Sequence, residues 1–202
     1  MKIRLLITLF MATIFLSATI ETEGYKVGDN ATDFKLKGVD GKMVSLVDYP
    51  QAKGFVVVFT CNTCPYAKLY EDRINELHQT YATKGYPVIA INPNDQGKSP
   101  GDSFEMMKKR AEEKKFEFPY LLDESQTVAT SYGATHTPQV YILNKASGKY
   151  KVMYIGAIDN NHKDKSLANE KYVENALNQL LSGKEVQVKT TKTIGCTIKW
   201  KG

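Results

Sequence analysis

The sequence predicts an α/β fold in which a mixed central sheet is flanked by helices. From residue 55 onward the apolar patterns follow the order strand, helix, strand, helix, strand, hairpin and helix, which is typical of that architecture. The run at residues 55–59 lacks alternation, as expected of a strand that is covered on both faces. The chain has 202 residues, 42% of them hydrophobic, which is enough for one core, so we expect a single domain.

Residues 1–18 have the layout of a secretory signal peptide. Two basic residues precede an apolar run at residues 5–16, and small or polar residues follow it. The run is shorter than the about 20 residues that a membrane-spanning helix needs. We therefore predict export to the periplasm or another extracytoplasmic compartment. An uncleaved membrane anchor is the alternative, because Leu16 fits poorly three residues before a cut after Ala18.

Local patterns place the elements of the first half of the chain. An Asp-Gly pair at residues 40–41 predicts a tight turn between strands at residues 33–36 and 43–46. Steps of three and four predict a helix after the central strand, ended by Gly85. Its inward stripe is Ala67, Tyr70, Ile74, Leu77 and Tyr81.

The second half is read in the same way. Asp102 or Ser103 can cap a helix that runs to about residue 115. Pro138 stands at the first residue of an apolar strand, where its missing N–H group is tolerated. Gly183 suits the end of the last helix. The remaining predictions are strands at 87–91, 120–122, 138–143 and 150–157, helices at 126–132 and 167–181, a domain over 24–183 and a C-terminal extension over 184–202.

Two cysteines, Cys61 and Cys64, lie where the central strand gives way to the first helix. A helix N-terminus has unpaired N–H groups and a partial positive charge, and both favour a thiolate over a thiol. We therefore expect Cys61 to be acidic and the more exposed of the two. Cys64, one turn on, is then placed to attack a mixed disulfide formed at Cys61.

Other uses of this pair are weaker. A structural disulfide across so short a loop would remove only about 2 kcal/mol of unfolded-chain entropy. A zinc site needs two further ligands, and the chain has no second C-x-x-C motif, only Cys196 and three scattered histidines. The position of the pair between a strand and a helix therefore favours redox chemistry.

Charge and cysteine content narrow the function classes. Without the two basic residues of the leader, the formal charge of +5 becomes +3. The basic residues are spread along the chain rather than gathered with aromatic residues, so a nucleic-acid partner is not expected. Outside the cytosol, thiols meet oxidants and disulfide-bearing proteins. Three cysteines make one pair and one left over.

Several motifs resemble those of thioredoxin-fold proteins. Residues 27–34, with Gly41-Lys42, are similar to the opening of the redoxin branch, the alkyl hydroperoxide reductase/thiol-specific antioxidant superfamily. Residues 61–66, 118–124 and 195–201 resemble a bacterial thioredoxin-family subgroup with a C-x-x-C-P motif and a GC-x-IKWK ending. The resemblance runs from about Lys26 to the end of the chain and implies a thioredoxin-like fold.

The resemblance also implies roles for single residues. It implies that Pro138 is cis and faces the cysteine pair, and that Thr137 offers backbone groups to an incoming extended peptide. The chain departs from the thioredoxin pattern at Thr60, where those proteins carry tryptophan. The buried acid of many relatives has no counterpart in residues 55–59. His136 is either a proton carrier or a solvated loop histidine.

Cys196 lies in the C-terminal extension, which a minimal thioredoxin fold does not need. Three interpretations stay open for it. It is a buried thiol, an intermolecular partner, or a third redox group folded over the pair.

We therefore predict an exported, monomeric thiol–disulfide oxidoreductase that acts on protein clients through Cys61 and Cys64 and exchanges electrons with a further thiol partner. No metal or organic cofactor is implied. One alternative is a thiol peroxidase, but Val58 stands where the P-x-x-x-T-x-x-C motif of peroxiredoxins has threonine. The other is a copper or zinc carrier that uses Cys61, Cys64 and His136, although copper-delivery relatives usually space their cysteines by three residues.

Overall fold

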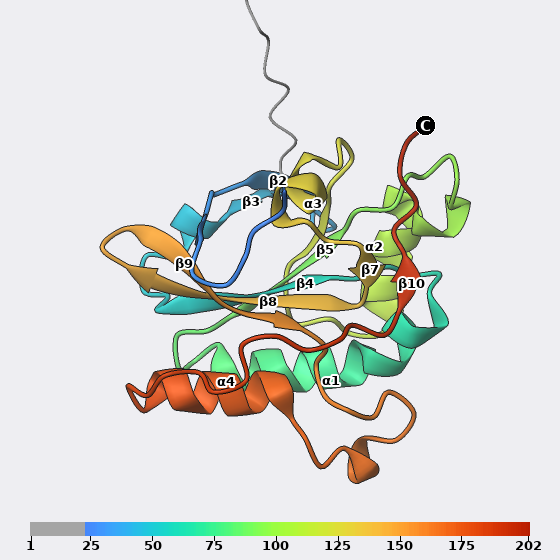
Figure 1. Cartoon of the computed structure of the whole chain (residues 1–202). Helices are drawn as coiled ribbons and strands as arrows, with labels where there is room; N and C mark the ends of the chain where they lie inside the picture. Colours follow the sequence, from blue (N-terminus) through green and yellow to red (C-terminus); the bar gives the residue numbers. More distant parts are fainter. Residues whose placement is uncertain (1–22) are drawn as a thin grey trace, which may run out of the picture.

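The computed structural model describes residues 23–202, so the predicted leader at residues 1–18 lies outside the described part. An eight-stranded mixed sheet has helices on both faces (Figure 1). The strand order is β1-β9-β8-β4-β5-β6-β2-β3. Its strands are β1 (Asn30–Ala31), β2 (Lys35–Gly38), β3 (Met43–Ser45), β4 (Gly54–Phe59), β5 (Val88–Asn92), β6 (Tyr120–Leu122), β8 (Gln139–Ala146) and β9 (Lys149–Gly156).

The helices and a second, small sheet complete the fold. The helices are α1 (Pro65–Tyr81), α2 (Phe104–Glu113), α3 (Thr127–Tyr132) and α4 (Tyr172–Leu181). The small sheet pairs β7 (His136–Thr137) with β10 (Cys196–Thr197), which are far apart in the sequence. Within residues 23–202, none of the helices combines the length and the apolar composition that crossing a membrane requires.

The core lies on both faces of β4, which pairs in parallel with β5 and antiparallel with β8. Val56 and Val58 belong to the apolar cluster that includes residues of α1 and α4. Phe55, Val57 and Phe59 belong to the cluster on the other face, with residues of α3. Every one of these side chains is fully buried. The absence of alternation in this strand therefore predicted its environment correctly.

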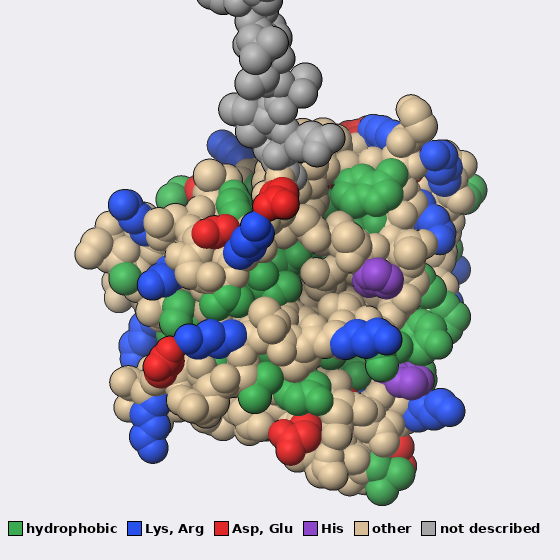
Figure 2. All heavy atoms as spheres, in the orientation of Figure 1, with side chains coloured by type: hydrophobic (Ala, Val, Ile, Leu, Met, Phe, Trp, Pro, Cys, Tyr) green, Lys and Arg blue, Asp and Glu red, His purple; other side chains and the backbone are tan. Residues whose placement is uncertain are grey.

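Local signals located most of the elements. The strands β2 and β3 form the predicted antiparallel hairpin, with Gly41 at a φ of 84° in its turn. The predicted stripe of α1 is buried in full: Ala67, Tyr70, Ile74, Leu77 and Tyr81. Figure 1 shows α1 and α4 side by side on one face of the sheet. Figure 2 shows Lys and Arg side chains scattered over the visible face rather than gathered into one patch.

One predicted helix start is confirmed and another is wrong. The helix α2 begins at Phe104 with Ser103, one of the two predicted caps, as its N-cap, while Asp102 turns away into the loop between the cysteines. The helix α4 begins at Tyr172 rather than at residue 167. Asn160 holds the preceding segment out of the helix, because its amide bonds to Asn169 and to the backbone N–H of Glu170. A contact between loops has overridden the helical periodicity.

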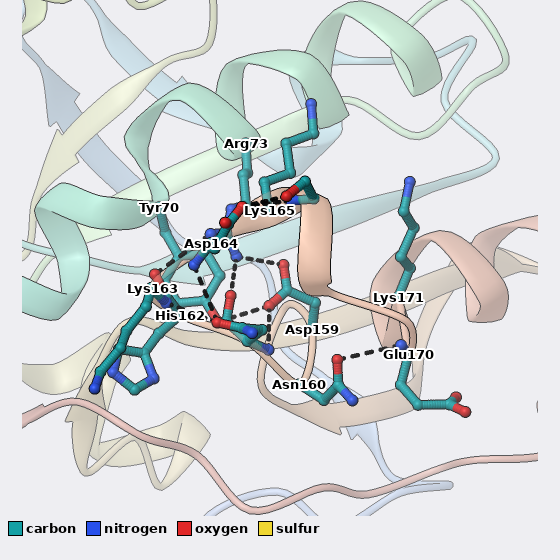
Figure 3. Close-up of polar contacts among 12 residues, drawn as sticks. Tyr70, Arg73, Asp159, Asn160, His162, Lys163, Asp164, Lys165, Glu170 and Lys171 are labelled. Carbon is teal, nitrogen blue, oxygen red and sulfur yellow. Dashed lines mark hydrogen bonds and ion pairs between the residues drawn. The ribbon is translucent and has the colours of Figure 1, made fainter.

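A buried ion pair ties α1 to the loop that follows β9 (Figure 3). Nη1 of Arg73 lies 2.6 Å from Oδ2 of Asp159 and also donates to the carbonyl oxygen of Asn161. The hydroxyl of Tyr70 donates to the other carboxylate oxygen of Asp159 at 2.9 Å. The side chains of Arg73 and Asp159 are only 9% and 5% exposed. Removal of one partner therefore leaves the other charge buried and unpaired.

We expect Arg73→Ala to lower the free energy of unfolding by about 3–5 kcal/mol, the usual cost of breaking a buried ion pair from one side. Urea denaturation followed by circular dichroism measures this change. Lys165→Ala is the matched control, because Lys165 pairs with Glu76 from the same loop to the same helix while both side chains are about half exposed. It should lose no more than about 1 kcal/mol. Equal losses in the two variants would contradict the assignment.

Candidate active site

The two predicted cysteines meet at the junction of β4 and α1. Cys61 is the second residue after β4, and Cys64 is the N-cap of α1, whose first residue is Pro65. Cys61 and Cys64 are only 3% and 2% exposed. The predicted difference in exposure is therefore not observed, because both residues are buried to nearly the same degree. Tyr66 and Cys196 pack against the pair and close it off from solvent.

Thr137 and Pro138 lie beside the pair, as the resemblance implied. The peptide bond between them is cis. The Sγ atom of Cys61 lies 3.2 Å from the hydroxyl oxygen of Thr137, and Sγ of Cys64 lies 3.1 Å from its carbonyl oxygen. The structure therefore brings all four residues into one site, with Thr137 in contact with both sulfurs.

The two thiols differ in pKa, so that the proton stays on Cys61 while Cys64 is the more acidic group. The thiol of Cys61 donates a hydrogen bond to Cys64, and this bond is the largest cause that raises the pKa of Cys61 and lowers the pKa of Cys64 to about 5. Burial and the negative charge of Asp102 raise the pKa of Cys61 further. Contacts from Cys196 and from the backbone N–H of Ala67 lower that of Cys64.

The position of the helix start contributes to this reversal of the expected order, after the larger effect of the contact between the two thiols. Because α1 begins at Pro65, the N–H groups of its first turn favour a charge on Cys64 rather than on Cys61. The carbonyl oxygen of Thr137 acts in the opposite direction, since only a protonated thiol donates to it. The net shift at Cys64 is nevertheless downward. Cys61 must therefore lose its proton before it attacks, and in the wild-type protein the neighbouring Cys64 thiolate can accept it.

We expect thiolate absorbance of the reduced protein to titrate with a pKa of about 5, far below the ordinary thiol value of 9.0. Absorbance at about 240 nm, where thiolates absorb, follows this charge. Cys64→Ser should abolish the low titration, and an unchanged curve would place the acidic sulfur at Cys61. Because folding depresses the pKa of Cys64, its contribution to stability is complete above pH 9 and is lost as the pH falls through 5.

A buried acid, Asp102, shapes the loop between the cysteines. Its side chain is fully buried. Its Oδ1 atom accepts from the backbone N–H groups of Asn62 and Thr63, at 2.6 and 3.3 Å. Side chains that also donate to this carboxylate are those of Thr63, Asn92, Asn94 and Ser99. The acid therefore acts on the backbone conformation of the site as well as on the pKa of Cys61.

The absence of a buried acid was inferred from residues 55–59 alone, and Asp102 was predicted only as a possible helix cap. A usable signal was present. Since β4 and β5 are parallel neighbours, the residues that follow each strand lie at the same edge of the sheet. The polar run at residues 92–102, which begins at the last residue of β5, is therefore predicted by topology to lie beside the cysteines. Asn62 is held by this same region, with its amide donating to the carbonyl oxygen of Gly101 and accepting from the hydroxyl of Tyr120.

The C-terminal residues 194–202, here called the strap, lie across the site. Cys196 of β10 is opposite Thr137 of β7 in an antiparallel pair, which Figure 1 shows beside the end of β8. The Sγ atom of Cys196 lies 2.6 Å from Sγ of Cys64. The strap therefore occupies the edge of β7 and adds a third sulfur to the pair.

The remaining predicted site residue, His136, is hydrogen-bonded to a neighbouring residue rather than to a cysteine. His136 is half-buried, and its Nδ1 atom shares a hydrogen bond with the hydroxyl of Thr135 at 2.8 Å. Over residues 23–202, no group of three or more His, Cys, Asp or Glu side chains is arranged to hold a metal ion. The described part of the chain thus lends no geometric support to a metal carrier.

Comparisons with known proteins agree with this fold. The thiol-disulfide oxidoreductase ResA of Geobacillus thermodenitrificans (strain NG80-2) is 27% identical over 146 residues, which cover 72% of this chain and 79% of that protein. The crystal structure of an uncharacterized conserved protein from Geobacillus kaustophilus has a TM-score of 0.80 and 38% identity, covering 90% of this chain and 96% of that one. A hypothetical protein from Sinorhizobium meliloti 1021 has a TM-score of 0.81 and 29% identity, covering 89% and 97%.

The family assignment rests on a longer match than any single motif. Residues 27–154 match the AhpC/TSA family, and this stretch includes the hairpin, the cysteine pair and the Thr137-Pro138 bond. This chain, with a mixed sheet and paired cysteines at the head of a helix, belongs to the AhpC/TSA family.

Proposed function

We propose that this protein is a thiol–disulfide oxidoreductase that acts on disulfides or thiols of other proteins through Cys61 and Cys64. One observation carries the proposal: Sγ of Cys61 and Sγ of Cys64 both contact Thr137, next to the cis bond at Pro138. Two sulfurs held at one residue are what a pair needs if one sulfur is to attack and the other is to resolve. The ResA relatives, which are named as thiol-disulfide oxidoreductases, support the same chemistry.

The reaction balances without a metal or an organic cofactor. Cys61 attacks one sulfur of a client disulfide, forming a mixed disulfide, and the other client sulfur leaves as a thiolate. Cys64 then attacks Sγ of Cys61, which forms the Cys61–Cys64 disulfide and releases the second client thiolate. The client gains two electrons and the pair loses two. An upstream thiol donor restores the pair, and the reverse sequence oxidises a client.

Export is part of the proposal. Its support is the leader-like composition of residues 1–18, together with the prevalence of stable disulfides outside the cytosol. Such a compartment would supply both the protein clients and the thiol partner.

Insulin reduction in the presence of dithiothreitol tests the proposed activity. We expect the purified protein to accelerate precipitation of the insulin B chain, and we expect Cys61→Ser to fall to the uncatalysed rate. The same samples are assayed for hydrogen peroxide consumption and for bound copper and zinc. Peroxide turnover without insulin reduction would overturn the proposal in favour of a peroxidase. Stoichiometric metal without insulin reduction would overturn it in favour of a carrier.

A further inference from the structure

Cys196 is the most accessible sulfur of the three. It is partly exposed, whereas Cys61 and Cys64 are both buried. Its Sγ atom lies 2.6 Å from Sγ of Cys64, although the two residues are 132 positions apart in the sequence. Resting on the function proposed above, we propose that Cys196 is a third redox sulfur: it takes the disulfide over from Cys61 and offers it at the surface to a reducing thiol.

The transfer is a disulfide exchange with no net oxidation. Starting from the Cys61–Cys64 disulfide, the thiolate of Cys196 attacks Sγ of Cys64. The Cys64–Cys196 bond forms, the Cys61–Cys64 bond breaks, and Cys61 leaves as a thiolate that takes up the proton given up by Cys196. An external thiol next attacks Sγ of Cys196 and expels Cys64 as a thiolate. A second external thiol then releases Cys196, so that two thiols become one disulfide.

The electrostatics of the cluster favour both steps. Burial raises the pKa of Cys196 to about 11, together with the hydrogen bond and the charge of Cys64. In the Cys61–Cys64 disulfide, Cys64 carries neither a charge nor a proton. The hydrogen bond and the charge of Cys64 then no longer raise the pKa of Cys196, and only burial does. In the reducing step Cys64 is the leaving group, and a thiol with a pKa of about 5 leaves readily.

The strap places Cys196 through contacts that do not involve sulfur. The backbone N–H of Ile198 donates to the carbonyl oxygen of Thr135 at 3.0 Å, and the Ile198 side chain is 4% exposed. The backbone of Lys199 exchanges hydrogen bonds with residues 94–95 and accepts from the amide of Gln126. Cys196→Ser should therefore leave the strap docked.

The docked strap also decides which sulfur an external molecule meets. It occupies the edge at Thr137 to which a client strand would add under the proposed function. With the strap in place, an external thiol reaches Cys196 and not Cys61. All three cysteines are free thiols while the strap is docked, so client entry under the proposed function requires the strap to leave β7, and a Cys64–Cys196 disulfide would prevent this.

A substitution at Gly195 can move the strap without removing Cys196, so it tests the position of the strap separately from its thiol. A Cβ atom added at Gly195 would lie 2.3 Å from the carbonyl oxygen of Thr137, and backbone cannot yield as a side chain does. Gly195→Ala therefore shifts the strap away from β7 while all three cysteines stay in the chain. Gly202→Ala is the matched control, since the nearest atom to its Cβ is Nζ of Lys98 at 3.4 Å.

Disulfide mapping of the oxidised full chain tests the proposal. Trypsin yields a peptide of residues 54–68, with both Cys61 and Cys64, and a peptide of residues 193–199 with Cys196. After free thiols are blocked, we expect the wild-type protein to yield these peptides joined, with fragmentation assigning the bond to Cys64. Cys196→Ser should carry its disulfide within residues 54–68. Gly195→Ala should lose most of the joined product, and Gly202→Ala should keep it.

The rate of reduction supplies a second readout. We expect reduced glutathione to open the disulfide of Cys196→Ser about tenfold more slowly than that of the wild type, because the remaining disulfide is buried and access limits exchange. If every oxidised sample carries its disulfide within residues 54–68 and the two rates agree, the third sulfur is excluded. Insulin reduction by the same samples would then show the proposed function standing without it. If the joined peptides form but wild-type protein does not reduce insulin, the proposed function fails and the exchange at Cys196 stands.

Discussion

Replacing Cys64 with alanine is expected to abolish turnover and to leave the protein joined to its client by a disulfide at Cys61. The loss of turnover should reach about a thousandfold, because catalytic groups that act as a unit fail together. Attack by Cys61 should persist, since the hydrogen bond to Cys64 is the main cause of its raised pKa and that bond is absent in the variant. No sulfur at position 64 then remains to release the client.

Non-reducing gels and peptide mass spectrometry, with insulin as the client, measure this trapping. Cys196 lies close enough to the pair to act in place of Cys64, so Cys64→Ala is also combined with Cys196→Ser. The double variant should trap at least as much client. Cys61→Ala is the reciprocal control and should trap none. Adducts through Cys64 in Cys61→Ala, with none in Cys64→Ala, would show that Cys64 is the attacking sulfur.

Asp102→Ala is expected to lower both stability and activity, although Asp102 contacts neither sulfur through a hydrogen bond within the described residues. The free energy of unfolding should fall by about 3–5 kcal/mol, because several buried donors lose their acceptor at once. Two of these donors are the backbone N–H groups of Asn62 and Thr63. Insulin reduction should fall by about a hundredfold, as expected when reacting groups shift by about 1 Å.

Asp102→Asn tests whether the effect passes through charge or through shape. An amide retains the size of the side chain but removes a charge that raises the pKa of Cys61. In the Cys64→Ala background, where the largest cause of the raised pKa is absent, a thiolate titration should show that adding Asp102→Asn lowers the pKa of Cys61. A purely structural role would leave the titration unchanged. Asp72→Asn is the matched control, because the Asp72 side chain is 81% exposed and the change should stay within about 0.5 kcal/mol. Wild-type stability and activity in Asp102→Asn would contradict the assigned role.

Local patterns predicted the scaffold well because a strand or a helix reports its own burial through the spacing of its apolar residues. The run that became β4 and the stripe of α1 are two examples, and both are buried as their spacing indicated. The predicted start of α4 was wrong, because apolar spacing does not report hydrogen bonds made to a neighbouring loop. Its periodicity extended back to residue 167, but hydrogen bonds from Asn160, distant in the chain from the helix core, hold the preceding residues out of it.

By itself the sequence determined the α/β scaffold, the position of Cys61 and Cys64 between a strand and a helix, and a strand next to Pro138, although β8 begins one residue later, at Gln139. Only the tertiary structure decided that both paired cysteines are buried, that Asp102 supports their loop, and that Cys196 lies against Cys64. These three features depend on contacts between segments 39 or more residues apart, as in the 132-residue separation of Cys64 and Cys196. Hydrophobic spacing reports which face of an element is buried, but it carries no information about which distant residue covers it.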